Sequence, residues 1–142
     1  MLELPKLHAG LKGTAALLVG VEHTAPRIGS GLFFVFATSA MTNLMEAAAL
    51  AAVEEMLPAG YQCLGTHFDV RHLAATPVGM HVRALAELIA IDGRTLSFRV
   101  EVRDEKEVIG DGMHQRTLVN VDRFDERVQK KLDRLGKHSS DR

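Results

Sequence analysis

Cysteine, tryptophan and an excess of either charge are nearly absent from this chain of 142 residues. It has one cysteine, Cys63, and no tryptophan, and its 17 Lys and Arg residues balance 18 Asp and Glu residues to a formal charge of -1. A single cysteine forms no internal disulfide and cannot build a thiolate-rich metal site, which indicates a reducing compartment. The balanced charge provides no basic stripe, so we expect neither nucleic acid nor a membrane surface as a partner.

We expect neither a targeting segment nor a membrane-spanning segment in this sequence. The apolar patch at 15–21 is surrounded by acids and a proline, and no small-residue cleavage pattern follows it. The run 39–57 is long enough to span a bilayer, but Asn43, Glu46 and two further acids interrupt it. We therefore interpret this run as a buried helix of a soluble fold and expect a cytoplasmic protein.

What the chain does have is enough apolar sequence for one compact core. It is 46% hydrophobic and 25% charged, without internal repeats, low-complexity segments or a linker. We expect a single domain over residues 1–142, with poor order at 1–12 and 137–142.

Hydrophobic periodicity predicts the elements of this domain. Residues 94–103 alternate between apolar and polar side chains, which is typical of a half-buried antiparallel strand. Asp92-Gly93 favours a tight hairpin before this strand. The predicted elements, in order, are a strand at 13–21, a lid-like loop at 23–36, a helix capped by Thr38 or Ser39 and ending at Pro58, strands at 64–73, 80–91, 94–103 and 108–121, and a helix at 122–135.

This order predicts an α+β fold in which a curled antiparallel sheet of about five strands wraps one long central helix, followed by a short C-terminal helix. One sheet covers only one side of a helix that is apolar on nearly every side. We therefore expect a second copy of the chain to bury the remainder, as a homodimer that could pair further into a tetramer.

Glu46 is the most informative residue of the central helix, because it is a lone acid among apolar neighbours. An unpaired carboxylate is costly to bury, so Glu46 is either partnered from elsewhere in the fold or retained for chemistry. Three residues distant in sequence are candidate partners: His72, His114 and Arg116. A structural ion pair between Glu46 and Arg116 remains an alternative to a catalytic role.

Counting by period places several polar residues on shared faces. His72 falls on the same strand face as Leu64, Phe68 and Val70, and His114 falls with Arg116, Gly110 and Gly112. Thr38, Thr42 and Glu46 follow one stripe of the helix. The counts predict that a carboxylate, hydroxyls, an imidazole and a guanidinium converge between helix and sheet.

Several short motifs, in this order and spacing, resemble the hot-dog-fold thioesterases, and among them the fluoroacetyl-CoA thioesterase family. The resemblance spans roughly residues 35–130. The matching stretches are Val35 to Thr38, Leu44 to Ala47, Leu64 to Thr66, His72 to Gly79, Ala86 to Leu88, Asp92 to Arg94 with Leu96 and Ser97, and Ile109 to Arg116.

The resemblance implies a site. Carried over by motif, the catalytic hydroxyl, carboxylate and imidazole correspond to Thr38, Glu46 and His72, the glycine near the acyl carbonyl to Gly65, and the active-site arginine to Arg116. His114 lies within the last motif, and we assign it a supporting role in substrate binding. Phe33 and Phe36 are candidates for an apolar acyl pocket. The loop that holds them does not align with the aromatic lid of the fluoroacetate-specific enzyme, so fluoroacetyl specificity is not expected.

These residue types suit thioester hydrolysis of a small or medium acyl-CoA. Glu46 would act as nucleophile or as base for water, Thr38 would orient it, and His72 would transfer a proton near neutral pH. We expect no cofactor beyond the CoA thioester substrate and no metal, because the remaining histidines form no cluster with acids. The alternative is a non-catalytic hot-dog protein that senses or sequesters an acyl thioester.

Overall fold

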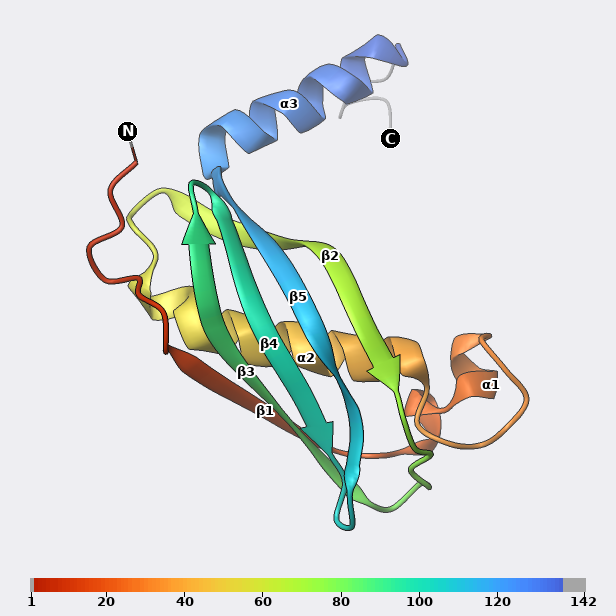
Figure 1. Ribbon diagram of the computed structural model, residues 1–142. Coiled ribbons are helices and arrows are strands. Elements are labelled where there is room, and N and C mark those ends of the chain that lie inside the picture. Colours follow the sequence, from red (N-terminus) through yellow and green to blue (C-terminus); the bar gives the residue numbers. More distant parts are fainter. Residues whose placement is uncertain (1, 137–142) are drawn as a thin grey trace.

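A computed structural model describes residues 2–136 of the chain, and these residues form a curled five-stranded antiparallel sheet around one long helix (Figure 1). The strands are β1 (Lys12–Leu18), β2 (Tyr61–His72), β3 (His81–Asp92), β4 (Thr95–Arg103) and β5 (Val108–Asn120), in the spatial order β1-β3-β4-β5-β2. The helices are α1 (Ala25–Ile28), α2 (Thr38–Val53) and α3 (Val121–Arg134), with short 3-10 turns η1 (Val21–His23) and η2 (Glu54–Met56). This is the hot-dog architecture that the resemblance implied.

The core lies between α2 and the concave face of the sheet. The alternation at 94–103 is confirmed, since Leu96, Phe98, Val100 and Val102 are at most 1% exposed and face the helix. The helix approaches β1 so closely that a Cβ on Gly13 would collide with the backbone of Ala48 and Ala52. A glycine at this strand position therefore sets how tightly α2 packs against the sheet.

The start of α2 differs from the prediction. Thr38 is the first helical residue and Ala37 is the N-cap, with no side-chain capping bond. Neither Thr38 nor Ser39 caps the helix, because both are already helical residues; the Thr38 hydroxyl bonds His72 instead. At the other end of the chain, Asn120 caps α3 by accepting a hydrogen bond from the Arg123 amide at 3.1 Å.

A bulge at Thr66 changes which residues of β2 face the helix. The pairing with β5 runs Gly65 to Arg116 and then His67 to Gln115, so Thr66 is an extra residue. Downstream of the bulge, Phe68, Val70 and His72 share the concave face, as predicted. Upstream it is Cys63 and Gly65, not Leu64, that lie opposite the inward-facing residues of β5, because one extra residue exchanges the two faces of a strand.

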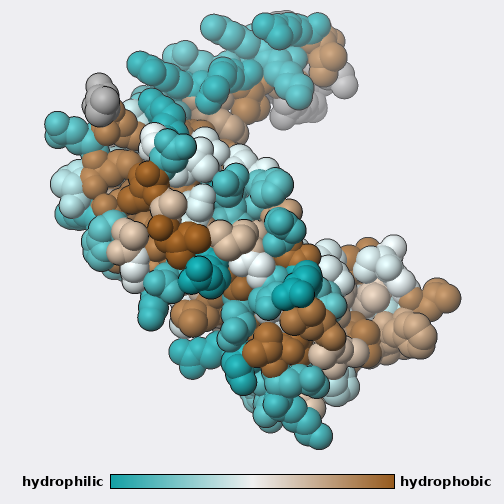
Figure 2. All heavy atoms as spheres, in the orientation of Figure 1, coloured by the Kyte–Doolittle hydropathy of each residue, from teal (hydrophilic) through white to brown (hydrophobic). Residues whose placement is uncertain are grey.

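The outer edges of β1 and β2 and part of α3 are not covered by any of the residues 2–136. β2 is an edge strand, bonded on one side to β5 along its whole length. α3 leaves the end of β5 and projects away from the sheet (Figure 1), with Val128 at 53% and Leu135 at 67% exposed. Figure 2 shows further hydrophobic side chains on the protruding end of the molecule that holds α1 and the loop after it. These surfaces motivate, but do not test, the expected homodimer.

The expectation of poor order at the chain ends stays a prediction. Met1 and residues 137–142 lie outside the described residues. Within 2–11, Leu7 is buried and the Gly10 amide donates to the Leu88 carbonyl at 2.7 Å. Of the helices among residues 2–136, none has the length and hydropathy that crossing a membrane requires.

Candidate active site

The structure brings Thr38 and His72 together at the first turn of α2. β2 ends at His72, and α2 begins at Thr38, and the Thr38 hydroxyl and His72 Nδ1 lie 2.8 Å apart in a hydrogen bond. The pair joins residues 34 positions apart in sequence, both of which the resemblance assigned to the catalytic set. We call these two residues the hydroxyl–imidazole pair.

The other ring nitrogen of His72 is available for chemistry. Nε2 is buried and has no hydrogen-bond partner among residues 2–136, so one donor or acceptor function of the ring is unmet in either tautomer. Burial lowers the pKa of His72 below its ordinary value, and an interaction with the Ala74 backbone offsets part of this effect. The imidazole is therefore neutral at pH 7, as a proton acceptor must be.

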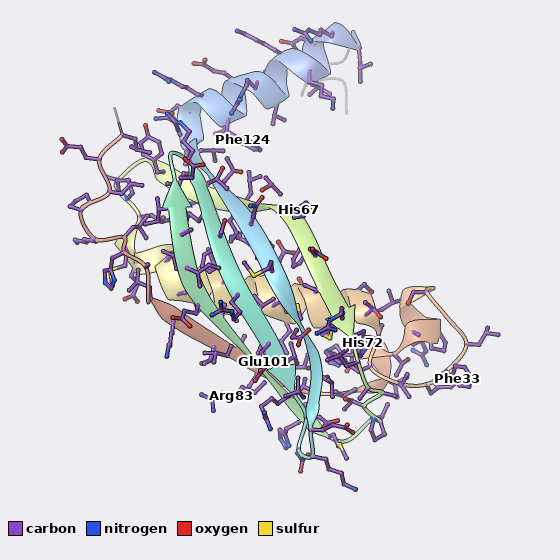
Figure 3. The ribbon with its side chains drawn as sticks, in the orientation of Figure 1. Phe33, His67, His72, Arg83, Glu101 and Phe124 are labelled. Atoms are coloured by element: carbon purple, nitrogen blue, oxygen red, sulfur yellow. The ribbon has the colours of Figure 1, made fainter. Side chains whose placement is uncertain are left out.

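A cavity of about 440 Å³ opens beside this pair. Its walls come from α1, the loop that follows it, and the segment after β2. Phe33 and Phe36 both line it, as predicted, but they differ in position: Phe36 is 1% exposed within the core, whereas Phe33 is 80% exposed at the outer end of the loop (Figure 3).

Glu46 lies two turns further along α2, against β2 and β5. Its Oε2 accepts a hydrogen bond from Arg116 Nη1 at 3.3 Å, and the same oxygen rests over Gly65. A Cβ on Gly65 would lie 2.5 Å from Oε2, so any larger residue would displace the carboxylate. Gly65 is thus required for the position of Glu46. This gives a physical reason for a glycine in the motif, which the sequence alone does not provide.

Arg116 is held by several groups at once. Its side chain is 7% exposed, and its Nη2 donates to the Cys63 carbonyl and its Nε to Cys63 Sγ, both at 3.2 Å. Nη1 points to Glu46 and also lies 3.3 Å from His114 Nε2. These bonds fix the plane of the guanidinium, so its position does not depend on Glu46 alone.

His114 serves Arg116 instead of contacting the cavity. Nδ1 donates to the His67 carbonyl at 2.9 Å, which leaves Nε2 as the acceptor for Arg116. The ring is fully buried and stacks on Phe68 with centroids 4.0 Å apart. Burial lowers the pKa of His114, the His67 backbone raises it, and the Arg116 charge lowers it further, with a net lowering. We call Glu46, Gly65, Cys63, His114 and Arg116 the carboxylate cluster.

The predicted convergence of all these groups is only partly correct. The carboxylate and the guanidinium meet, and the hydroxyl and the imidazole of His72 meet, but the two groups are separate within one chain. Thr38 and Glu46 are eight residues apart on α2, which corresponds to about 12 Å along the helix axis. Thr42, between them, donates to the Ser39 carbonyl at 2.9 Å and joins neither group.

Two parts of this region were missed by reasoning from sequence. Cys63 was assigned no role, although it supplies two acceptors to Arg116. The bulge at Thr66 is what turns Cys63 inward, and the adjacent Gly65 was the only signal of it. The small residues Ala74 and Ala75, which line the cavity, follow His72 and Leu73 in the sequence and were assigned no role. Among residues 2–136, no three His, Cys, Asp or Glu side chains gather as metal ligands would.

The sheet wrapped over one helix, with these groups between them, defines a hot-dog-fold thioesterase. The chain belongs to the fluoroacetyl-CoA-specific thioesterase family, whose profile matches residues 19–122. It is 42% identical over 97 residues to the fluoroacetyl-CoA thioesterase of Streptantibioticus cattleyicolor, an alignment that covers 68% of this chain and 70% of that protein.

Solved structures agree with this assignment. The fluoroacetyl-CoA thioesterase FlK superimposes with a TM-score of 0.82 at 34% identity, covering 88% of this chain and 97% of FlK. A phenylalanine-to-alanine variant of FlK, in complex with fluoroacetate and CoA, gives a TM-score of 0.78 at 35% identity over 83% of this chain and 99% of the variant. A thioesterase superfamily member from Thermus thermophilus gives 0.85 at 25% identity, covering 96% of this chain and 98% of that one.

Proposed function

We propose that this protein hydrolyses acyl-CoA thioesters, with Glu46 as nucleophile or general base and the hydroxyl–imidazole pair in orientation and proton transfer. The observation that carries the proposal is the hydrogen bond between Thr38 and His72 Nδ1 beside an apolar cavity, with the buried His72 Nε2 left without a hydrogen-bond partner by residues 2–136. Unmet hydrogen-bonding capacity in a buried imidazole is costly unless a substrate or water completes it.

The chemistry requires one water per thioester. The Glu46 carboxylate either takes a proton from the attacking water or itself attacks the carbonyl carbon, forming an anhydride that water then cleaves. The bond from the carbonyl carbon to sulfur breaks, and the products are a free acid and CoA thiol. Backbone N–H groups at Gly65, or in the first turn of α2 where helical partners are missing, would stabilise the oxyanion by about 3 kcal/mol per donor.

The separation of Glu46 from the hydroxyl–imidazole pair within one chain supports a site shared between two copies. β2 is a free edge of twelve residues, and such an edge pairs readily with another strand. Gly65 and His72 both lie on the concave face of β2. An antiparallel pairing about a two-fold axis near Phe68 and Asp69 would carry the partner's His72 to the level of Gly65, where Glu46 rests. We propose this homodimer as the active form.

A CoA-release assay with free-thiol detection tests the activity. The wild-type protein is expected to release thiol, and Glu46→Gln to lower kcat by at least 10²-fold, because the amide can neither attack nor accept the proton. Circular dichroism and thermal unfolding serve as folding controls for the variant. Saturable acyl-CoA binding by the wild type without thiol release would instead favour the non-catalytic alternative.

Mixed dimers test the shared site. If each site combines Glu46 of one copy with His72 of the other, a dimer of one Glu46→Gln chain and one His72→Ala chain has one site with both defects and one intact site. Unfolding and refolding equal amounts of the two inactive variants together should restore about one quarter of wild-type activity, since about half of the dimers are mixed. A site contained within one chain would give no recovery, and this result would refute the shared arrangement.

The cytoplasmic location of the protein stays a prediction.

A further inference from the structure

We infer that the acyl group of the substrate is uncharged, apolar and much larger than fluoroacetyl, of about the size of a hexanoyl or phenylacetyl group. This inference rests on the proposed function and specifies the substrate class of the same site. It comes from the volume, the walls and the mouth of the cavity beside the hydroxyl–imidazole pair.

The volume is too large for a two-carbon acyl group. The cavity measures about 440 Å³. A cavity of about 150 Å³ with aliphatic walls is enough to hold a benzene molecule. The cavity is widely open to solvent, so an acetyl or fluoroacetyl group, which is smaller than benzene, would contact only part of its lining, whereas a longer acyl group would contact more of it and gain more dispersion energy.

The walls carry no charge. Apart from Ser30 and the hydroxyl–imidazole pair, every lining residue is apolar or glycine. Within the part of the chain that the structure describes, no Lys, Arg, Asp or Glu lines the cavity. A succinyl or other carboxylated acyl group would bring a negative charge into this space without a counterion, at a cost that an alkyl or phenyl group does not incur.

Small residues and a fixed backbone set this size. Ala25 and Ala74 are half-buried members of the wall, and larger side chains at either position would occupy the space. The inner wall is held by the Phe36 amide, which donates to the Thr76 carbonyl at 2.8 Å, and by the Ala37 amide, which donates to the His23 carbonyl at 2.9 Å. These bonds keep the wall from collapsing around a smaller acyl group.

The mouth of the cavity carries apolar side chains that only a longer acyl chain would reach. Leu32 is 89% exposed and Phe33 80%, and both line the cavity. Phe33 lies at the outer end of the loop, clear of the body of the protein (Figure 3). An acyl chain that extends to this rim would cover these two side chains and gain their burial.

Chain-length profiles test the inference. We expect kcat/KM to rise about threefold to fourfold for each methylene from acetyl-CoA to hexanoyl-CoA, which is the transfer free energy of one buried CH₂ expressed as a ratio. Phenylacetyl-CoA should match hexanoyl-CoA, and succinyl-CoA should be among the poorest substrates. Acetyl-CoA or fluoroacetyl-CoA as the best substrate, or succinyl-CoA equal to butyryl-CoA, would overturn the inference.

Cavity-filling variants locate the effect. Ala74→Leu and Ala25→Leu should each lower the ratio of kcat/KM for hexanoyl-CoA to kcat/KM for acetyl-CoA at least tenfold, since the long acyl group uses more of this space than the short one. The matched control is Ala16→Leu on β1, an exposed position outside the cavity, which should change neither substrate. An equal loss for both acyl lengths in the two cavity variants would contradict the inference.

Binding separates this inference from the proposed function. Hexyl-CoA and ethyl-CoA, thioethers that cannot be hydrolysed, are compared by calorimetry on the wild type. If no thioester is cleaved but hexyl-CoA binds much more tightly than ethyl-CoA, hydrolysis is wrong and the acyl class is right. If thioesters are cleaved but the two thioethers bind equally, hydrolysis is right and the acyl class is wrong.

Discussion

The hydroxyl–imidazole pair and the carboxylate cluster each include one residue of α2, Thr38 and Glu46, two turns apart, but they are built differently. The pair rests on one hydrogen bond, with Thr38 exposed at the helix start and an apolar cavity beside it. The cluster has Arg116 at its centre, 7% exposed and bonded to Glu46, His114 and Cys63. One part is lightly held and open to a ligand, and the other is fixed before any ligand arrives.

The carboxylate cluster is preorganised by its hydrogen bonds, whereas the hydroxyl–imidazole pair has fewer bonds and more freedom to adapt to a ligand. A charged group is most useful in catalysis when its surroundings hold it in place and need no rearrangement during the reaction. Arg116 and the locked, neutral His114 meet this condition for Glu46. The pair instead faces the variable part of the substrate. The comparison therefore predicts that changes in the cluster affect folding and activity together, whereas changes in the pair affect activity alone.

The largest effect on folding stability is expected from Arg116→Met. The change leaves Glu46, His114 Nε2 and the Cys63 carbonyl without their donor, so unfolding free energy should fall by about 2 kcal/mol, below the usual figure for a buried pair because Glu46 is 39% exposed. Activity should fall at least tenfold. Urea unfolding and thiol release measure the two effects.

Arg71→Met provides the matched control. Arg71 forms an ion pair with Asp111 at 3.1 Å, but its side chain is 71% exposed. Its loss should cost less than about 1 kcal/mol and leave activity unchanged. Similar stability losses in the two methionine variants would contradict the account of the carboxylate cluster.

Thr38→Val is expected to change folding stability less than Arg116→Met does, and to act mainly on activity. The substitution keeps the shape and removes the hydroxyl that bonds His72, so kcat should fall about 10- to 100-fold. The free energy of unfolding should change by no more than about 1 kcal/mol, because the lost hydrogen bond is a single, solvent-exposed one. Thr38→Ser should restore most of the activity. A drop in stability that accounts for the lost activity would show that Thr38 is merely structural.

The smallest effect is expected from mild acid. Burial lowers the pKa of both His72 and His114, so between their folded values and the ordinary value of 6.5 the unfolded chain binds more protons than the folded one. The free energy of unfolding should therefore be constant above pH 6.5, as far as these two groups are concerned, and should decline as the pH falls below 6.5. Thermal unfolding at pH 7.5 and pH 5.5 measures the decline, and His114→Gln should reduce it. Equal declines in wild type and variant would exclude His114 as a source.

Activity should follow the same direction. Because catalysis uses neutral His72, the acid limb of the rate profile should have its midpoint below pH 6.5.

Much of the fold follows from local pattern. The strict alternation at 94–103, the Asp92-Gly93 turn and the apolar run around Glu46 each specify an element by side-chain period or by backbone conformation; Gly93, for instance, takes the positive φ of 59° that its turn needs. The sequence offered Arg116 as one possible partner of Glu46, and the structure contains this contact. Thr38 was expected to orient Glu46, but within one chain its hydroxyl bonds His72 instead. Their catalytic roles stay predictions.

By itself, the sequence determined the five strands, the long helix and the C-terminal helix, their order and the isolation of one acid in an apolar helix, because these depend on neighbours within a few residues. It did not indicate α1, which lies in the segment expected to be a loop, or the end of α2 at Val53 before Pro58. The tertiary structure alone decided that Thr66 bulges, that Cys63 rather than Leu64 faces the helix, and that the carboxylate lies two turns from the imidazole's hydroxyl partner. The physical reason is that strand register and cavity volume depend on how distant segments pack, and a single extra residue in a strand reverses every face that period counting assigns.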